Sequence, residues 1–304
     1  MTDRIKDKSN GGVTVFAPAK INLFLAVTSK RTDGYHELIT VMAKLGIGDL
    51  VRIEKNTLLK EPSLSCPGFE ELENRENLVL MAVEKWLDRV GGDRGYQIEL
   101  RKAIPPMSGL GGGSSDAVSA LLAMNELSDN QLSNSELKEL AAEIGSDCPS
   151  FLDEGICLAE GRGEEISPII ASVTDDLFGH EIFLFRPSMG LSTTEIYQRL
   201  AQNSTYSSQN WAKVRIGAWS AGELPTEEFL HNDLETPVFQ KYLFFQPLFD
   251  QIDKEFGLKC LLSGSGSCCF TCLPKGFDGL IELKGMIEQA WGDECWVEKT
   301  YLIR

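Results

Sequence analysis

The sequence lacks any hydrophobic run long enough to cross a membrane. A membrane-spanning helix needs about 18–20 consecutive apolar residues, and the longest run here, Ile21–Val27, is interrupted by Asn22. The N-terminal segment is polar and has no apolar stretch of the signal-peptide type. We therefore expect residues 1–12 to be a disordered tail and the protein to be cytoplasmic, with no membrane partner.

Basic residues are scarce as well. The 304-residue chain has 29 Lys and Arg against 45 Asp and Glu, which gives a formal net charge of −16. A surface this acidic repels nucleic acid and anionic membranes, so we expect neither as a partner. A nucleotide substrate is still compatible, because one phosphate needs only a few backbone N–H groups or a lysine.

Cysteine and histidine are present without the spacing of a metal site. The eight cysteines are scattered, and Cys157 and Cys260 have apolar neighbours, where a reduced thiol packs as a small hydrophobe. Cys269 and Cys272 have the spacing of a zinc or redox pair, but no second pair and no nearby histidine accompany them. We interpret them as part of a packed strand, and the sequence identifies no metal ligand.

Strand and helix patterns are mixed without regular βαβ alternation, which favours an α+β fold, and the length favours two domains. The patterns predict strands at Val13–Phe16, Ile21–Val27, Leu38–Leu45, Asp49–Glu54, Tyr96–Arg101, Glu181–Phe185, Lys259–Leu262, Cys268–Leu273 and Cys295–Leu302. They predict helices at Leu78–Val90, Ser114–Leu127, Ser133–Ile144, Thr193–Gln202, Pro247–Glu255 and Gly279–Ala290, and a helix start at Glu227–Leu230. Because the pattern restarts after Ser167, we expect domains at 13–168 and 169–304.

A glycine-rich segment between a predicted strand and a predicted helix is the most informative part of the sequence. Four glycines in five positions let the backbone approach a ligand closely, and the first N–H groups of the next helix form an anion site. The segment lacks the lysine of a Walker A loop and the third glycine of a dinucleotide fingerprint. We interpret it as a phosphate-binding loop of another kind, with a flexible linker or tight turn as the alternative. Its residues are Pro105, Pro106, Met107, Ser108, Gly109, Leu110, Gly111, Gly112, Gly113, Ser114 and Ser115.

Three further segments place polar residues where chemistry is possible. Lys20 and Asn22 share one face of an apolar strand, so Lys20 is either a partner for phosphate or carboxylate or an edge-strand lysine that blocks aggregation. Asp147 follows a helix stop, and it is either a general base or a turn and N-cap residue. The glycine-serine turn Ser263–Ser267 either closes on phosphate or substrate or simply joins two strands.

Taken in order, these motifs resemble the galactokinase, homoserine kinase, mevalonate kinase and phosphomevalonate kinase (GHMP) superfamily. The segment Arg31–Leu38, shortly after Ala17–Leu23, is similar to the branch that phosphorylates CDP-methylerythritol in the non-mevalonate isoprenoid route. The resemblance implies a ribosomal-protein-like N-terminal domain and a ferredoxin-like C-terminal domain, both α+β, with the active site between them. It also implies an ATP-dependent kinase that uses Mg²⁺, acts on the 2-hydroxyl of the substrate, and is a monomer or homodimer.

The resemblance assigns roles in phosphoryl transfer to single residues. Pro105–Ser115 would hold the ATP phosphates, and Lys20 and Asp147 would be the catalytic pair. Asn22 would contact the polyol of the substrate. Phosphoryl transfer needs positioned phosphates, charge stabilisation and an oriented hydroxyl. A lysine beside Asp147 would keep that carboxylate ionised and able to accept a proton.

The resemblance also implies a pocket for the cytidine base. Tyr35 and His36 would hold the base, and Thr193 and Tyr197 would form the other side of the pocket. Asp116, directly after the loop, occupies a position where asparagine is also familiar in this family, and a carboxylate there suits the helix dipole.

Two other functions stay open. The first is another small-molecule kinase of the superfamily, which would act on a polyol without cytidine. The second is a catalytically silent relative that binds nucleotide as a regulator. The silent relative is disfavoured because Lys20, Asp147 and the glycine loop are all intact.

Overall fold

The computed structural model describes residues 4–9, 11–170, 172–203 and 206–304. These residues group into two compact units, and each unit combines segments that are separated in the sequence. Unit 1 comprises Met1–Ala19, Ile47–Pro106 and Gly111–Glu154, and unit 2 comprises Lys20–Gly46, Met107–Leu110 and Gly155–Arg304. The division into domains at 13–168 and 169–304 stays a prediction.

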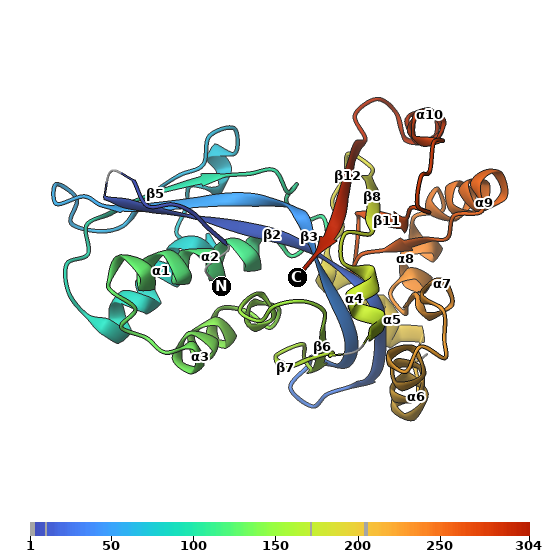
Figure 1. The fold of residues 1–304 in the computed structure, drawn as a ribbon, viewed down its shortest axis with the longest axis horizontal. Helices are drawn as coiled ribbons and strands as arrows, with labels where there is room; N and C mark the ends of the chain where they lie inside the picture. The colour runs from blue at the N-terminus through green and yellow to red at the C-terminus, as the bar shows by residue number, and fades with distance from the viewer. Residues whose placement is uncertain (1–3, 10, 171, 204–205) are drawn as a thin grey trace. The chain divides into compact units, whose positions relative to one another are not determined.

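Unit 1 is a mainly antiparallel sheet with helices packed on one side (Figure 1). The sheet order is β1 (Ile5–Asp7), β2 (Gly12–Lys30), β3 (His36–Lys55), β5 (Tyr96–Arg101) and β4 (Ser63–Ser65), with β4 parallel to β5. The helices are α1 (Leu78–Val90), α2 (Gly112–Leu127) and α3 (Asn134–Ile144), and the short 3₁₀ helices are η2 (Glu70–Leu72) and η3 (Cys148–Phe151). Helix α2 is buried along most of its length, from Ser115 to Asn125, so its N-terminal turn has a fixed position in the core.

Unit 2 continues β2 and β3 and adds a second set of strands. Along the sheet, β3 is followed by β12 (Trp296–Ile303), β8 (Glu181–Arg186), β11 (Cys269–Cys272) and β10 (Cys260–Leu262). The hairpin β6 (Cys157–Gly161) and β7 (Glu165–Pro168) also pairs with β3, and β9 (His231–Asn232) pairs in parallel with β2.

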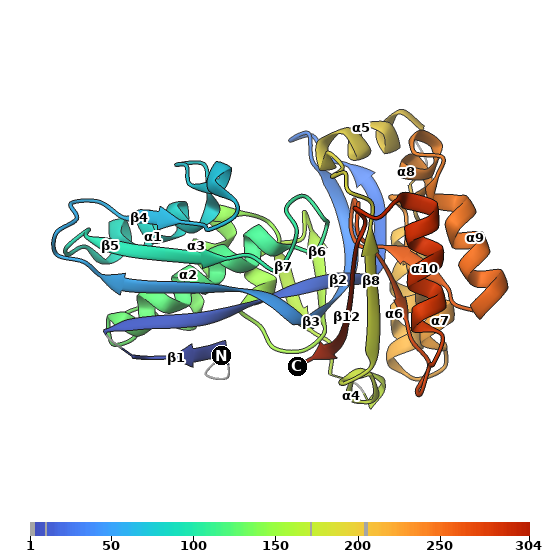
Figure 2. The same cartoon turned by 90° about the horizontal axis from the view of Figure 1, so that it is seen from above.

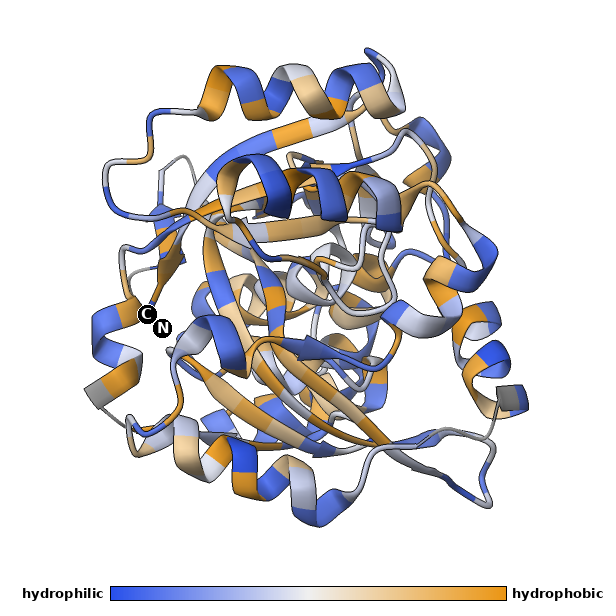
Figure 3. Cartoon of the chain, turned by 90° about the vertical axis from the view of Figure 1, so that its right-hand side faces the viewer, coloured by the Kyte–Doolittle hydropathy of each residue, from blue (hydrophilic) through white to orange (hydrophobic). Residues whose placement is uncertain are grey.

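Seven helices belong to the described part of unit 2. They are α4 (Ser172–Leu177), α5 (Thr193–Asn203), α6 (Gln209–Ser220), α7 (Thr226–Phe229), α8 (Glu235–Lys241), α9 (Phe245–Phe256) and α10 (Leu280–Trp291). Helices α9 and α10 lie side by side next to β8 and β12 (Figure 2). Their apolar faces meet Phe183 and Phe185 of β8 in one core. Figure 3 shows the corresponding pattern, with hydrophobic residues concentrated on the strands and both kinds of residue on the helices.

Local signals located several elements correctly. The predicted bounds of α1 and β5 are confirmed, and Ser133 caps α3 by accepting the N–H of Glu136, which bonds back in a capping box. Two predicted interruptions are wrong, because β2 and β3 each run through them as single strands. A Cβ on Gly48 would lie 2.4 Å from the carbonyl oxygen of Ala17, so this glycine serves close strand packing rather than a turn.

The expectation of a disordered tail at residues 1–12 is wrong for part of that segment. Ile5–Asp7 pairs antiparallel with β2. The Arg4 side chain donates hydrogen bonds to the Phe16 carbonyl at 2.9 Å and to Ser119 Oγ at 2.7 Å. These bonds tie the segment to unit 1; residues 1–3 and 10 lie outside the described residues. Within the described ranges, no helix is both long enough and apolar enough to cross a membrane.

Candidate active site

The N-terminus of α2 has the backbone geometry of an anion site, as expected of the glycine loop. Gly111 caps the helix with φ +70°, a left-handed conformation that favours glycine. The first helical hydrogen bond runs from Ser115 N–H to the Gly111 carbonyl at 2.9 Å. The N–H groups of Gly112, Gly113 and Ser114 precede this bond, so they are available to an anion, and the helix dipole adds to the attraction.

Gly112 is more closely packed than its neighbour Gly113. A Cβ there would lie 3.0 Å from Ile104 Cγ2 and 3.3 Å from Lys102 Nζ. A Cβ on the neighbouring Gly113 would meet only Leu78 Cδ1, at an ordinary 3.7 Å. Larger side chains at the two positions should therefore have different effects.

Behind this helix terminus lies a buried cluster of three charged side chains. Lys102 Nζ donates to Asp49 Oδ2 at 2.5 Å and to Asp116 Oδ2 at 2.7 Å. Asp49 Oδ1 also accepts the N–H groups of Ala103 and Ile104, directly before the glycine loop. The cluster therefore links β3, the segment entering the loop and Asp116 in the N-terminal part of α2.

The cluster controls the protonation of its members. Burial raises the pKa of Asp116 well above its usual range, Asp49 raises it further, and Lys102 opposes both effects. Burial by itself lowers the pKa of Lys102, but the two carboxylates outweigh it and raise that pKa. Burying charged groups is costly unless they are paired, and the two ion pairs of Lys102 lower that cost.

Asp147 lies at the start of η3, where its backbone carbonyl accepts hydrogen bonds from Ser150. It occupies the N-cap position of η3, although its side chain makes no capping hydrogen bond there, so the general-base and turn alternatives both stay predictions. The next residue, Cys148, hydrogen-bonds through its thiol with Ser114 in the first turn of α2. Burial raises the pKa of this thiol to about 12, although the bond from Ser114 lowers it. Within unit 1, the Asp147 turn is therefore next to the glycine-loop helix.

In unit 2, Lys20 is tied to the other part of the glycine loop. It is 5% exposed, and Nζ donates to Asn22 Oδ1 at 2.7 Å and to the Gly109 carbonyl at 3.0 Å. Its backbone N–H donates to the Leu110 carbonyl at 2.9 Å. Asn22 is held in turn by Thr40, whose Oγ1 accepts from Nδ2 at 2.8 Å. Lys20 is thus a buried residue fixed on the loop, which argues against the edge-strand alternative.

The glycine-serine turn closes on the same place. Ser263 Oγ donates to the Gly109 carbonyl at 3.0 Å, and the Cys268 N–H donates to the Ser108 carbonyl at 2.9 Å. Gly109 has φ +79°, and a Cβ there would lie 2.2 Å from the Ser263 carbonyl oxygen. The turn is therefore more than a connection between β10 and β11, because it holds Met107–Leu110.

Asn232 is a residue of this region that the sequence did not reveal. Its Nδ2 donates to the carbonyl groups of Leu262 and Gly264, at 2.9 and 2.8 Å, and so fixes the turn from behind. A lone asparagine near a short strand has no distinctive sequence signal. Its role comes from a contact across 32 residues of chain.

The residues expected at the base pocket are only partly assembled in unit 2. The His36 ring lies 5.1 Å from the ring of Tyr197, centre to centre, and 6.1 Å from that of Tyr206. His36 is buried, its Nε2 has no hydrogen-bond partner among the described residues, and burial followed by the charge of Lys30 lowers its pKa. Tyr35 is exposed, and Thr193 instead bonds Ser265 in the glycine-serine turn, Oγ to Oγ, at 2.8 Å.

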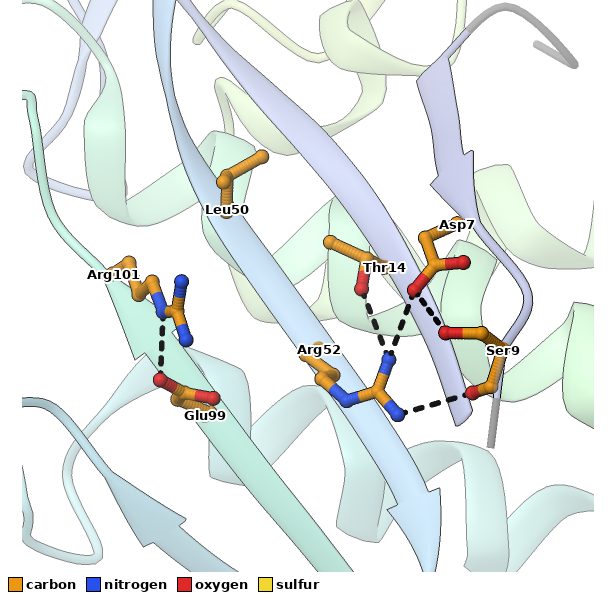
Figure 4. A pocket seen from close by; sticks show the side chains of 7 residues that line it. All are labelled: Asp7, Ser9, Thr14, Leu50, Arg52, Glu99 and Arg101. Atoms are coloured by element: carbon orange, nitrogen blue, oxygen red, sulfur yellow. Dashed lines mark hydrogen bonds and ion pairs between the residues drawn. The ribbon is translucent and has the colours of Figure 1, made fainter. Parts of the chain in front are cut away.

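A polar pocket in unit 1 does not coincide with any predicted site residue (Figure 4). Arg52 and Arg101 dominate it, and both are engaged by carboxylates: Arg101 by Glu99 at 2.7 Å and Arg52 by Asp7 at 3.5 Å. The other lining residues are Ser9, Thr14 and Leu50. We assign no function to this pocket. Among the described residues, no group of three or more His, Cys, Asp or Glu is placed to hold a metal ion.

Comparison with known proteins agrees with these motifs. The family described as "GHMP kinases N terminal domain" matches residues 77–155, which include the whole glycine loop and Asp147. The 4-diphosphocytidyl-2-C-methyl-D-erythritol kinase of Desulfitobacterium hafniense is 34% identical over 290 residues, which are 95% of this chain and 93% of that protein. The kinase of the same name from Methylacidiphilum infernorum is 35% identical, over 94% and 95% of the two chains.

The chain belongs to the 4-diphosphocytidyl-2-C-methyl-D-erythritol kinase family. A crystal structure of a kinase from this family has a TM-score of 0.73 and 31% identity, and the match covers 95% of this chain and 99% of that one. The homoserine kinase of Cytophaga hutchinsonii, at 18% identity, has a TM-score of 0.74 over 98% and 97% of the chains, which shows a shared fold. The predicted GHMP kinase fold, family and kinase class are confirmed.

Proposed function

We propose that this chain phosphorylates the 2-hydroxyl of 4-diphosphocytidyl-2-C-methyl-D-erythritol, with MgATP as the co-substrate. The observation that carries the proposal is the buried Lys20, which unit 2 holds on the glycine loop through the Gly109 carbonyl and Asn22. Burying a lysine is costly unless its charge is used or compensated. A lysine fixed on a phosphate-binding loop supplies charge stabilisation for phosphoryl transfer.

The residues divide the work of the reaction. The N–H groups at the start of α2 bind and orient the ATP phosphates. Lys20 stabilises negative charge that spreads over the transferred phosphoryl group, and Mg²⁺, which enters with the nucleotide, adds to this stabilisation. Asn22 binds the polyol of the acceptor. Asp147 orients the acceptor hydroxyl and accepts its proton, as a general base does.

The acceptor is recognised through its base. In this acidic protein, attraction by overall charge would not hold a cytidine diphosphate, so we assign recognition to stacking and hydrogen bonds. Tyr35 offers a ring face, and the buried His36 has an Nε2 without a partner among the described residues, which can meet the polar edge of cytosine. Thr193 and Tyr197 form the other side of the proposed pocket.

Two further points concern the cellular compartment and the oligomeric state. All eight cysteines are free thiols, and this supports a reducing compartment such as the cytoplasm. A monomer or homodimer remains the expectation from the family resemblance.

A turnover assay tests the proposal directly. Purified protein would be supplied with MgATP and one acceptor at a time: the cytidine-linked methylerythritol, mevalonate, homoserine or galactose. We expect ADP release only with the cytidine-linked acceptor. Turnover of another acceptor would support a different GHMP kinase, and nucleotide binding without any turnover would support a silent relative.

A further inference from the structure

Arg162 lies at the tip of the β6–β7 hairpin in a turn whose shape is fixed by its neighbours. Gly161 and Gly163 flank it with φ +72° and +114°, conformations that other residues rarely adopt. Strand β6 pairs with β3 in a register that places Gly161 opposite Leu38. The hairpin therefore brings Arg162 to the beginning of β3, beside Tyr35, although the two residues are far apart in the sequence.

The Arg162 side chain is stacked on Tyr35. Its guanidinium carbon lies 5.2 Å from the centre of the Tyr35 ring, within the range of a cation–π contact. Tyr35 is nevertheless 58% exposed. The tyrosine ring thus has a protein group over one face while much of its surface remains accessible to another planar group.

Glu164 holds the guanidinium in this place. Arg162 Nε donates to Glu164 Oε1 at 3.0 Å, and the Arg162 backbone N–H donates to Glu164 Oε2 at 2.6 Å. Burial raises the pKa of Glu164, but these hydrogen bonds outweigh it and keep the carboxylate ionised. The charge of Arg162 is therefore already paired with a carboxylate. Its remaining contact, the one with the Tyr35 ring, is the contact that the inference uses.

We propose that Arg162 is a positioning residue for the cytidine base: it covers one face of Tyr35 and holds the ring so that the opposite face stacks on cytosine. The inference rests on the proposed function, because it takes the base as the group that Tyr35 binds. Arg162 acts through Tyr35 and does not itself bind the diphosphate of the acceptor.

Binding of cytidine and of CDP separates these two roles. Arg162→Ala should weaken the binding of both ligands by the same factor, about 2- to 5-fold, which corresponds to about 0.5–1 kcal/mol for an exposed cation–π contact. Arg162→Lys should recover part of the loss, because it keeps the charge without the planar group. In kinetics, KM for the cytidine-linked acceptor should rise while kcat and KM for ATP stay unchanged.

Arg304→Ala is a matched control. Arg304 also stacks at 5.2 Å, over the Phe178 ring, and pairs with Asp175, but no predicted site residue takes part. This variant makes the same change in net charge and should leave cytidine and CDP binding unaltered. Thermal unfolding of all variants checks that the hairpin change has not destabilised the protein.

The sharpest test asks whether Arg162 acts on the base only through Tyr35. In a Tyr35→Ala background, Arg162→Ala should cause no further loss of cytidine binding. An equal loss in that background, a loss confined to CDP, or no loss in any background would overturn the proposal. If the wild-type protein binds cytidine but does not phosphorylate the cytidine-linked acceptor, the proposed function fails, while the Arg162 result can still be read.

Discussion

The two units bring their site residues together in different ways. In unit 1, Lys102, the glycines at 111–113 and Asp116 lie within a short stretch of chain that contains the helix N-terminus. In unit 2, Ser263 donates to the Lys20 carbonyl at 3.5 Å across 243 residues of sequence. The comparison shows that the contacts around the helix N-terminus in unit 1 come largely from nearby residues, whereas those around Lys20 in unit 2 come from residues far apart in the sequence.

The largest expected effect on turnover comes from a substitution at Asp147. Asp147→Asn should lower kcat by about 100- to 10,000-fold, because a positioned general base is lost. A loose transition state would place the loss at the lower end of this range. The affinity for ATP, measured by calorimetry, should not change. Near-normal turnover would show that Asp147 only forms a turn.

Gly112→Val should weaken ATP binding without affecting cytidine binding. The side chain would crowd Ile104 and Lys102 and displace the backbone N–H groups proposed to bind the ATP phosphates, and overpacking of this kind typically costs about 1–3 kcal/mol of folding stability. Gly113→Ala is the control, since its Cβ has room. If the affinities for ATP and for cytidine fell by the same factor in the Gly112 variant, general misfolding would be indicated. The expected difference between the two units would then not hold.

Tyr35→Ala should have the opposite selectivity. Stacking on an aromatic side chain is worth about 1–3 kcal/mol per base, so KM for the cytidine-linked acceptor should rise about 5- to 150-fold. KM for ATP should barely move, and Tyr35→Phe should retain most of the affinity. Unchanged acceptor kinetics in Tyr35→Ala would remove the base pocket from this part of unit 2.

Asp116→Asn should change the pH dependence of stability. Because burial raises the pKa of Asp116, the folded state holds this proton more tightly than the unfolded state, whose pKa is about 3.9. The free energy of unfolding therefore falls as pH rises from that value toward the folded pKa. Asparagine does not titrate, so the variant should gain stability relative to wild type between pH 5 and pH 8.

Urea unfolding at both pH values measures this effect. The other ionisable groups facing Asp116 are Asp49, Lys102 and Cys66, and all of them are kept in the variant. A difference between the two proteins that is the same at pH 5 and pH 8 would show that Asp116 is ionised in the folded state.

Features that depend on contacts between neighbouring residues could be predicted from the sequence, whereas features that depend on contacts between distant residues could not. Helices α1 and α3 and strand β5 depend on neighbouring residues, and local patterns are sufficient to find them. The glycine loop could be recognised in the sequence for the same reason. The continuity of β2 could not be predicted, because Pro18 suggests a break. In the fold, Ala17 and Ala19 are buried and the strand runs through them.

The same reasoning explains what was missed at the candidate site. Asn232 and Arg162 acquire their contacts only when distant strands pair, and neither stands in a recognisable motif. Ser263 belongs to the predicted glycine-serine turn, but its bond to the Gly109 carbonyl is a long-range contact that the sequence does not show. The carboxylate partner of Lys102 in β3 is 53 residues away. Roles for Lys20, Asp147, Asn22, Tyr35, His36, Thr193 and Tyr197 were inferred from the family resemblance and remain proposals.

The central claim is that Lys20 and Asp147 act together on the transferred phosphoryl group. The most direct test is kcat for Lys20→Ala, Asp147→Asn and the double variant, with MgATP and the cytidine-linked acceptor at saturation. Residues that act as a unit are strongly non-additive, so we expect each single variant to lose most of the activity and the double variant to be little worse than the poorer single. Losses that multiply in the double variant, or a Lys20→Ala protein with normal turnover per folded molecule, would contradict the account.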